Sequence, residues 1–222
     1  MKFVLWEKLA ELEGKELWLL IGAAVACVAL IVLAVILGSR KRESVPGGRG
    51  LTTKMLVQGA LCVGMAFVLS YIKLFSMPLG GSVTLFSMLP IVLFAWLYGP
   101  VAGFTAAFAY SLLQIVQGAY VIHWAQFILD YLVAFTVLGV AGFFKKSLPL
   151  GMAVAGLCRM ACSVLSGVVF FSEYAAEAGY TSAIWYSVVY NASTIGVDTV
   201  LCVIAAMIPA VQRACLRIRD GK

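Results

Sequence analysis

Seven long apolar segments dominate this sequence and restrict the folds that it can adopt. They run approximately over residues 17–38, 55–75, 84–98, 101–116, 121–144, 148–171 and 183–211. A helix that crosses about 30 Å of hydrocarbon needs roughly 20 mostly apolar residues, because it rises about 1.5 Å per residue. With 63% apolar and 12% charged residues, the chain lies far outside the composition of soluble domains. The pattern predicts an all-α integral membrane protein.

The positive charges gather in three short segments, which indicates how the chain is oriented in the membrane. The formal net charge is +6, and most Lys and Arg residues lie within residues 40–54, 145–146 and 213–222. Such clusters between apolar segments are typical of cytoplasmic loops and not of a nucleic-acid-binding surface. Residues 74–83 and 172–182 contain no Lys or Arg. Seven alternating helices in the cell membrane therefore predict an N-terminus outside and a C-terminus in the cytoplasm.

A polar segment separates the first apolar segment from the other six. Residues 39–52, SRKRESVPGGRGLT, combine charge, a proline and three glycines, which predicts a basic, flexible cytoplasmic linker. We therefore expect an extracellular N-terminal segment with one extra transmembrane helix over residues 1–38 and a six-helix membrane domain over residues 53–212. Residues 213–222 are expected to form a basic cytoplasmic tail.

Three charged residues fall inside the apolar segments, where charge is costly. They are Asp130, Arg159 and Asp198, and a charge at the bilayer centre costs about 2.5–3.5 kcal/mol on insertion scales. Counting about 1.5 Å per residue from the outer helix ends places Arg159 roughly 18 Å deep and Asp198 about 22 Å deep. We expect these two to form a structural ion pair, because buried charges need partners. In the alternative, Arg159 pairs with Asp130 and the whole group is structural.

A shallower layer of polar side chains predicts a binding site in the outer half of the membrane. By the same count, Asp130, Ser163 and Asn191 lie roughly 12 Å below the outer surface, and Tyr186 lies about 5 Å below it. A carboxylate without a cationic partner at its own depth is either neutral or available to a cationic ligand. Tyr131 and Tyr186 accompany Asp130 and Asn191 in the sequence, and aromatic faces beside a carboxylate suit a flat organic cation.

The residue inventory argues against most classes of enzyme. The six cysteines lie within or at the ends of apolar segments and form neither a disulfide framework nor the close ligand set of a zinc site. His123 is the single histidine, and the chain contains no P-loop and no nucleophile elbow. We therefore expect neither a metal nor a cofactor. An intramembrane enzyme that uses Asp130 or Asp198 as acid or base is the less favoured class of function.

Small residues in segment 55–75 predict close helix contact. Ala60 and Gly64 have the small-xxx-small spacing that lets two helices approach closely, and Gly59 and Ala66 lie nearby. These residues either pack inside the domain or dock another membrane protein. The pattern by itself is compatible with both roles.

Five strings of residues stand in the same order as in one known family of transport proteins. They are SMPLGGSV (76–83), MLPIVL (88–93), QFILDYLVAF (126–135), SGVVFF (166–171) and YSVVYNAS (186–193). Together they resemble the thiamine-specific substrate-binding components, or S-components, of energy-coupling-factor (ECF) transporters over residues 53 to about 212. The resemblance implies that a six-helix S-component body binds extracellular thiamine with high affinity. Its pocket would lie near the outer face and be closed by the loop 74–83, which includes Gly80, Gly81 and Ser82.

The same resemblance implies partner proteins. An S-component is not itself an ATPase, and import requires a transmembrane coupling protein and two cytoplasmic ATPases. In this family the small-residue pattern on the first helix of the body contacts the coupling protein. The resemblance therefore favours Ala60 and Gly64 as docking residues.

The resemblance also assigns residues to the pocket. The acidic pocket residue of the family matches Asp130, and the tyrosine beside it matches Tyr131. Three further pocket positions match Tyr120, Tyr186 and Asn191. These assignments coincide with the polar layer that the depth count places in the outer half of the membrane.

Two pocket positions depart from the family pattern. The histidine that is usual four residues after the helix arginine is Ser163 here, and a position often filled by tryptophan is Phe171. Phenylalanine can still stack on a flat ligand. Because Ser163 replaces the histidine, another vitamin or a thiamine precursor is the alternative ligand.

Overall fold

The described part of the chain is almost entirely helical. The structure is a computed structural model that describes residues 52–77 and 81–219, so the extra N-terminal helix and nearly all of the linker lie outside the described residues. Three described helices, Thr53–Tyr71, Leu148–Phe170 and Ala183–Met207, are long and apolar enough to cross a membrane. Three shorter apolar helices lie between the first two of them in the sequence. This arrangement confirms the predicted six-helix body.

The elements follow the six apolar segments of the body in order. The fourth and sixth helices are each built from consecutive pieces, because each contains a π-helical stretch, η2 or η4, in which the helix widens. The elements are α3 (Thr53–Tyr71), β1 (Lys73–Ser76), β2 (Ser82–Thr84), α4 (Leu89–Tyr98), α5 (Pro100–Val116), α6 (Trp124–Phe127), η2 (Ile128–Val133), α7 (Ala134–Thr136), η3 (Val137–Phe143), α8 (Leu148–Phe170), α9 (Ser172–Glu177), α10 (Ala183–Asn191), η4 (Ala192–Gly196), α11 (Val197–Met207) and α12 (Pro209–Arg219).

A short β-hairpin is the main departure from the predicted helices. Strands β1 and β2 pair antiparallel, with Phe75 opposite Val83 and Ser76 opposite Ser82. The segments predicted as helices over 55–75 and 84–98 therefore lose residues at their outer ends, and α3 ends at Tyr71 while α4 begins at Leu89. Strands of three and four residues are too short to show an alternating pattern in an apolar sequence.

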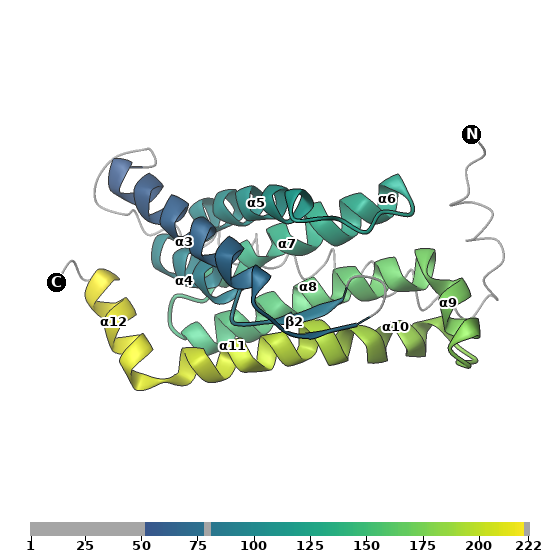
Figure 1. Cartoon of the computed structure of the whole chain (residues 1–222). Coiled ribbons are helices and arrows are strands. Elements are labelled where there is room, and N and C mark those ends of the chain that lie inside the picture. The colour runs from purple at the N-terminus through teal and green to yellow at the C-terminus, as the bar shows by residue number, and fades with distance from the viewer. Residues whose placement is uncertain (1–51, 78–80, 220–222) are drawn as a thin grey trace.

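The last apolar segment is also divided. The helix predicted over 183–211 ends at Met207, and Ile208 is extended with a ψ of 123°. Pro209 then begins α12, since proline fits the first turn of a helix but cannot continue a preceding one. Figure 1 shows α12 turning away from the direction of α11 at one end of the bundle. The predicted boundary at residue 212 therefore falls inside a helix.

The apolar core is centred on the short helix α4. Six of its ten residues are buried, among them Ile91, Val92 and Trp96, and it packs against α3, α5, η3 and α8. The outer face of α3 is the opposite case, because large apolar side chains such as Leu61 and Val68 are more than half exposed. Exposed apolar faces around a buried centre are what a bundle surrounded by lipid requires.

Glycines bring three of the helices into backbone contact. A Cβ atom on Gly139 of η3 would lie 2.6 Å from the backbone nitrogen of Phe104 on α5, and a Cβ on Gly103 would lie 2.5 Å from the Cβ of Ala95 on α4. Gly99 joins α4 to α5 with a φ of +92°, which glycine adopts without strain. The contacts between α4, α5 and η3 therefore leave little space between the backbones of these helices.

We expect Gly139→Ala to destabilise the protein, because its new methyl group meets backbone that no side-chain rotation can move away. Overpacking of this kind costs about 1–3 kcal/mol. Gly64→Ala is the matched control, since nothing lies within 4 Å of the position that its Cβ would take. Thermal unfolding of both purified variants in detergent checks this, and equal melting temperatures would contradict the inferred contact.

Candidate ligand-binding site

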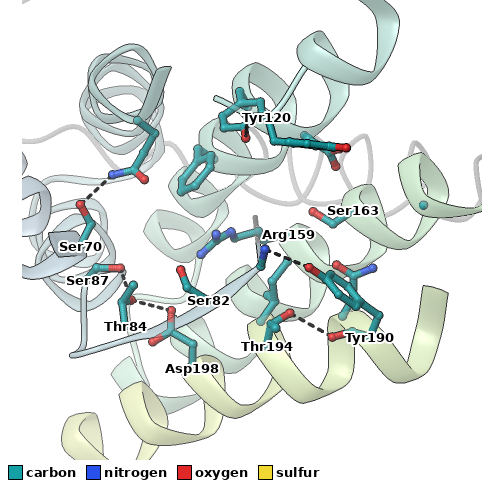
Figure 2. A pocket seen from close by; sticks show the side chains of 18 of the residues that line it. Ser70, Ser82, Thr84, Ser87, Tyr120, Arg159, Ser163, Tyr190, Thr194 and Asp198 are labelled. Carbon is teal, nitrogen blue, oxygen red and sulfur yellow. Dashed lines mark hydrogen bonds between the residues drawn. The ribbon is translucent and has the colours of Figure 1, made fainter. Parts of the chain in front are cut away.

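A cavity of about 200 Å³ lies among the helices, with walls from α3, β2, α5, the fourth helix, α8, α10, η4 and α11. A single water needs about 10–15 Å³ by the same measure, so the cavity has room for an organic molecule. Figure 2 shows polar side chains of several elements converging on it, including Ser82, Arg159, Ser163 and Asp198. Polar and apolar groups share its lining, as is typical of a site for an amphipathic small molecule.

The cavity contains every ligand-binding residue that the sequence predicts. The predicted loop residues Gly81 and Ser82 also line it, whereas Gly80 lies outside the described residues. Arg159 and Asp198 line the same space. The predicted ligand-binding residues that line it are Tyr120, Asp130, Tyr131, Ser163, Phe171, Tyr186 and Asn191.

Asp130 lies on the π-helical stretch η2 and is held by two neutral donors. Its Oδ2 accepts a hydrogen bond of 2.7 Å from Ser166 Oγ on α8 and one of 2.9 Å from Gln126 Nε2 on α6. Neither of these two donors is cationic; Ser163 is a further neutral group that interacts with the carboxyl group, and the charge of Arg159 also acts on it. A site built this way is complementary to a cationic or amine-bearing ligand.

Within the described residues, no direct hydrogen bond joins Arg159 to Asp198, although the charge of Arg159 acts on the Asp198 carboxyl group. Within residues 52–77 and 81–219, Asp198 Oδ2 accepts instead from Thr84 Oγ1 at 3.0 Å, and neither Asp198 Oδ1 nor Arg159 Nε has a hydrogen-bond partner. The guanidinium carbon of Arg159 lies 4.2 Å from the centre of the Phe135 ring. The hairpin strand β2 supplies the hydroxyl that the sequence did not reveal, and the Phe135 ring engages the cation. The alternative pair of Arg159 with Asp130 is absent from the described residues as well.

Aromatic rings form the wall of the cavity beside the α5–α6 connection and the end of α8. The rings of Tyr120 and Phe171 stack with their centres 6.2 Å apart and an interplanar angle of 29°. Tyr120 and Tyr174 also share a hydrogen bond of 3.3 Å between their hydroxyls. On the other side, the rings of Tyr186 and Tyr190 lie 6.1 Å apart. A carboxylate and aromatic faces therefore line the same cavity, as the sequence predicts.

The β-hairpin is bound to the α10 side of the cavity by specific contacts. The backbone nitrogen of Gly81 donates to the hydroxyl of Tyr190 at 2.9 Å, and Ser193 Oγ donates to Met77 Sδ at 3.3 Å. A Cβ on Gly81 would lie 2.4 Å from that tyrosine oxygen, so only glycine allows this approach. Met77 and Gly81, the described residues on either side of the tip of the predicted closing loop, thus lie against η4 and α10.

The two predicted docking residues lie outside the cavity on α3. Ala60 and Gly64 are exposed, and nothing lies within 4 Å of a Cβ position on Gly64. Gly59 and Ala66, by contrast, are buried, and a Cβ on Gly59 would lie 3.0 Å from the Phe94 ring. Internal packing is therefore the role of Gly59 and Ala66, whereas Ala60 and Gly64 are available to a partner.

Several lining residues were missed by the sequence prediction. Gln126 and Ser166 each lie three or four positions from a residue that was singled out, so helical spacing from Asp130 and Ser163 could have found them. Thr194 lies three positions after Asn191, and Tyr190 directly precedes Asn191. No comparable signal marks the polar and charged residues near α3 and the hairpin, which are Ser70, Lys73, Thr84, Ser87, Gln114 and Gln117.

Comparison with known proteins settles the family. Residues 56–218 match the family described as thiamine transporter protein. The chain belongs to this family. It is 31% identical over 169 residues to the thiamine transporter ThiT of Bacillus subtilis strain 168, a match that covers 67% of this chain and 86% of that protein.

A solved structure of a family member has the same fold. ThiT from Listeria monocytogenes superposes with a TM-score of 0.60 at 25% sequence identity, and the match covers 71% of this chain and 95% of the ThiT chain. Family membership and the apolar helices together establish that the chain is a membrane protein with the fold of ThiT. The family match begins at residue 56, so the residues before the six-helix body lie outside it.

We expect Tyr190→Phe to loosen the hairpin, because it removes the oxygen that accepts from Gly81 and leaves the ring in place. The net loss of such a hydrogen bond is about 0.5–1.5 kcal/mol. Hydrogen exchange of peptides that contain residues 81–84 should become faster. Tyr98→Phe is the matched control, since the hydroxyl of Tyr98 donates to Gln58 and not to the hairpin. Equal exchange in the two variants would contradict the contact.

Proposed function

We propose that this chain binds extracellular thiamine as the substrate-specificity subunit of an ECF-type, ATP-driven vitamin importer. Its membership of the thiamine transporter family supports thiamine as the ligand. The observation that carries the proposal is the position of Asp130, whose carboxylate forms no ion pair among the described residues and shares the cavity with stacked aromatic rings. Thiamine combines an aminopyrimidine with a thiazolium cation, and both rings are flat.

The cavity suggests how each part of thiamine is recognised. Asp130 accepts from the aminopyrimidine and complements the positive charge, while Tyr120 or Phe171 stacks on a ring face. Asn191 is buried and its Nδ2 donates to the backbone oxygen of Ser187 at 2.9 Å, which leaves Oδ1 as an acceptor for the ligand. Tyr186 lines the same region and orients a ring edge. No cofactor and no metal takes part in this binding scheme.

The proposed orientation places the basic segments in the cytoplasm. Lys54 lies in the first turn of α3, Lys145 and Lys146 connect η3 to α8, and Arg213 and Arg217 lie on α12. The positive-inside rule then puts the C-terminus inside the cell, the N-terminus outside and the cavity toward the outer face of the cell membrane. Thiamine would reach the site from outside, which suits an importer.

Import by this chain requires partners in the proposed scheme. The subunit is not an enzyme, and ATP hydrolysis is the task of two cytoplasmic ATPases that act through a transmembrane coupling protein. The exposed positions of Ala60 and Gly64 on α3 support a docking face for that coupling protein. Neighbouring exposed side chains such as Leu61 and Val68 extend this apolar face.

A second ligand is supported by one residue. Ser163 stands where the family usually has a histidine, and it lines the cavity within the same wall as Ser166. A smaller hydroxyl side chain would favour another vitamin or a thiamine precursor. Competition against bound thiamine by pyrimidine and thiazole fragments decides between them, because a fragment that outcompetes thiamine would make the precursor the physiological ligand.

We expect Asp130→Asn to weaken thiamine binding at least tenfold, because a hydrogen bond to a charged group contributes about 1.5–3 kcal/mol and tenfold in Kd corresponds to about 1.4 kcal/mol. Titration of the purified protein, followed by tryptophan fluorescence, measures the effect. Gln114→Leu is the control within the same cavity, since Gln114 bonds Ser70 and not Asp130. An unchanged dissociation constant for Asp130→Asn would remove this residue from the site.

We expect Gly64→Leu to abolish thiamine uptake by cells and to leave thiamine binding by the purified protein within twofold. The added side chain projects from the exposed face of α3 and cannot reach the cavity. Ala109→Leu adds comparable bulk to an exposed position of α5 and should support normal uptake. Loss of uptake in both variants, or in neither, would argue against α3 as the docking face.

A further inference from the structure

Gln126 occupies a buried position in which both ends of its side-chain amide are hydrogen-bonded. The residue is 2% exposed and lies on α6, four positions before Asp130. Its Nε2 donates to Asp130 Oδ2 at 2.9 Å and to the backbone oxygen of Tyr120 at 3.1 Å, while its Oε1 accepts from the backbone nitrogen of Ile122 at 3.3 Å. Two acceptors lie beside one end of the amide and one donor lies beside the other, so the first end is the nitrogen Nε2 and the second is the oxygen Oε1.

The same contacts join the carboxylate to the outer wall of the cavity. Tyr120 and Ile122 belong to the connection between α5 and α6, and the backbone nitrogen of Tyr120 also donates to the hydroxyl of Tyr131 at 2.8 Å. Tyr120 in turn carries the ring that stacks on Phe171. The turn of helix that bears Asp130 therefore holds the stacking wall in place through two side chains, Gln126 and Tyr131.

We propose that Gln126 is a positioning residue for ligand recognition: its amide fixes the Asp130 carboxylate against Ser166 for the ligand's amine, and sets the position of the Tyr120 wall. The inference rests on the proposed function for the identity of the ligand. The hydrogen bonds from Gln126 and Ser166 both end on one oxygen, Oδ2, and Ser163 is a further neutral group beside the same carboxyl group. Fixing the group before the ligand arrives reduces the entropy that binding must overcome.

An amide is the side chain that this position needs. A glutamate at residue 126 would direct a carboxylate at both Asp130 and the carbonyl of Tyr120, and all three groups are acceptors. A leucine would leave the Tyr120 carbonyl, the Ile122 amide and Asp130 Oδ2 without the partner that they now share. The size of the side chain therefore does not explain why glutamine stands at this position. Its function is to donate hydrogen bonds to Asp130 and to the carbonyl of Tyr120.

A double-mutant cycle with thiamine tests the coupling between the two side chains. We expect Gln126→Leu to weaken thiamine binding by at least tenfold in the parent protein, and by less than threefold in an Asp130→Asn background, because the carboxylate that it positions is then gone. Gln114→Leu is the matched control and should change the dissociation constant by the same factor in both backgrounds. Equal effects of Gln126→Leu in the two backgrounds would overturn the proposal.

A second ligand separates positioning from a general loss of structure. Oxythiamine carries an oxygen in place of the amino group on the pyrimidine, so it lacks the amine that the proposal assigns to Asp130. We expect Gln126→Leu to change oxythiamine binding by less than threefold, whereas a merely structural role would weaken both ligands alike. If the leucine variant does not purify as a single species, Gln126→Glu takes its place, with the same expected ratio between the two ligands.

An infrared measurement without ligand decides the proposal independently of thiamine. The difference spectrum between the parent and Asp130→Asn proteins isolates the bands of this carboxyl group. We expect these bands to shift in the Gln126→Leu protein, measured against its own Asp130→Asn partner, because one of the two donors to Oδ2 is lost. Unshifted bands would refute the positioning role. A parent protein that does not bind thiamine would refute the proposed function alone, and the infrared result would still stand.

Discussion

The need to satisfy charged groups at membrane depth is the constraint on which this structure depends. Asp130, Arg159 and Asp198 lie in helices that lipid surrounds, where no bulk water is available to hydrate them. The fold therefore turns all three toward one cavity and supplies neutral partners there. Ser166 and Thr84 provide two of those partners, and each comes from an element other than the one that carries the charge.

The two sides of the bundle differ in how closely their helices pack. On the side of α4, α5 and η3, glycines allow backbone contact and the helices leave little space. On the side of α8, α10 and α11, polar side chains keep the helices apart and a cavity results. The described hairpin residues are attached to this second side, since Thr84 bonds Asp198 on α11 and Gly81 bonds Tyr190 on α10. Close backbone packing on one side thus stands opposite a polar cavity on the other.

The sequence allowed accurate prediction of whatever depends on local pattern. Apolar length located the six helices of the body, and Asp130, Ser163 and Asn191, which the sequence places at one depth, line one cavity. Depth alone does not say which groups contact each other, and Thr84, not Arg159, donates to Asp198 Oδ2. The partner that replaced it, Thr84, lies on a strand whose pairing depends on residues more than a hundred positions from Asp198 in sequence, and no local periodicity encodes such a contact.

The π-helical stretches η2 and η4 have a consequence for how such a site can change over time. Each accommodates an additional residue compared with a regular helix, and the wider turn absorbs the rotation of about 100° that one extra residue would otherwise impose on every later side chain. Deleting a single residue from η2 would restore the regular helix and present a different side chain where Asp130 now stands. Insertion and deletion inside a transmembrane helix, and not only substitution, are therefore routes by which relatives can acquire a new ligand preference on an unchanged scaffold.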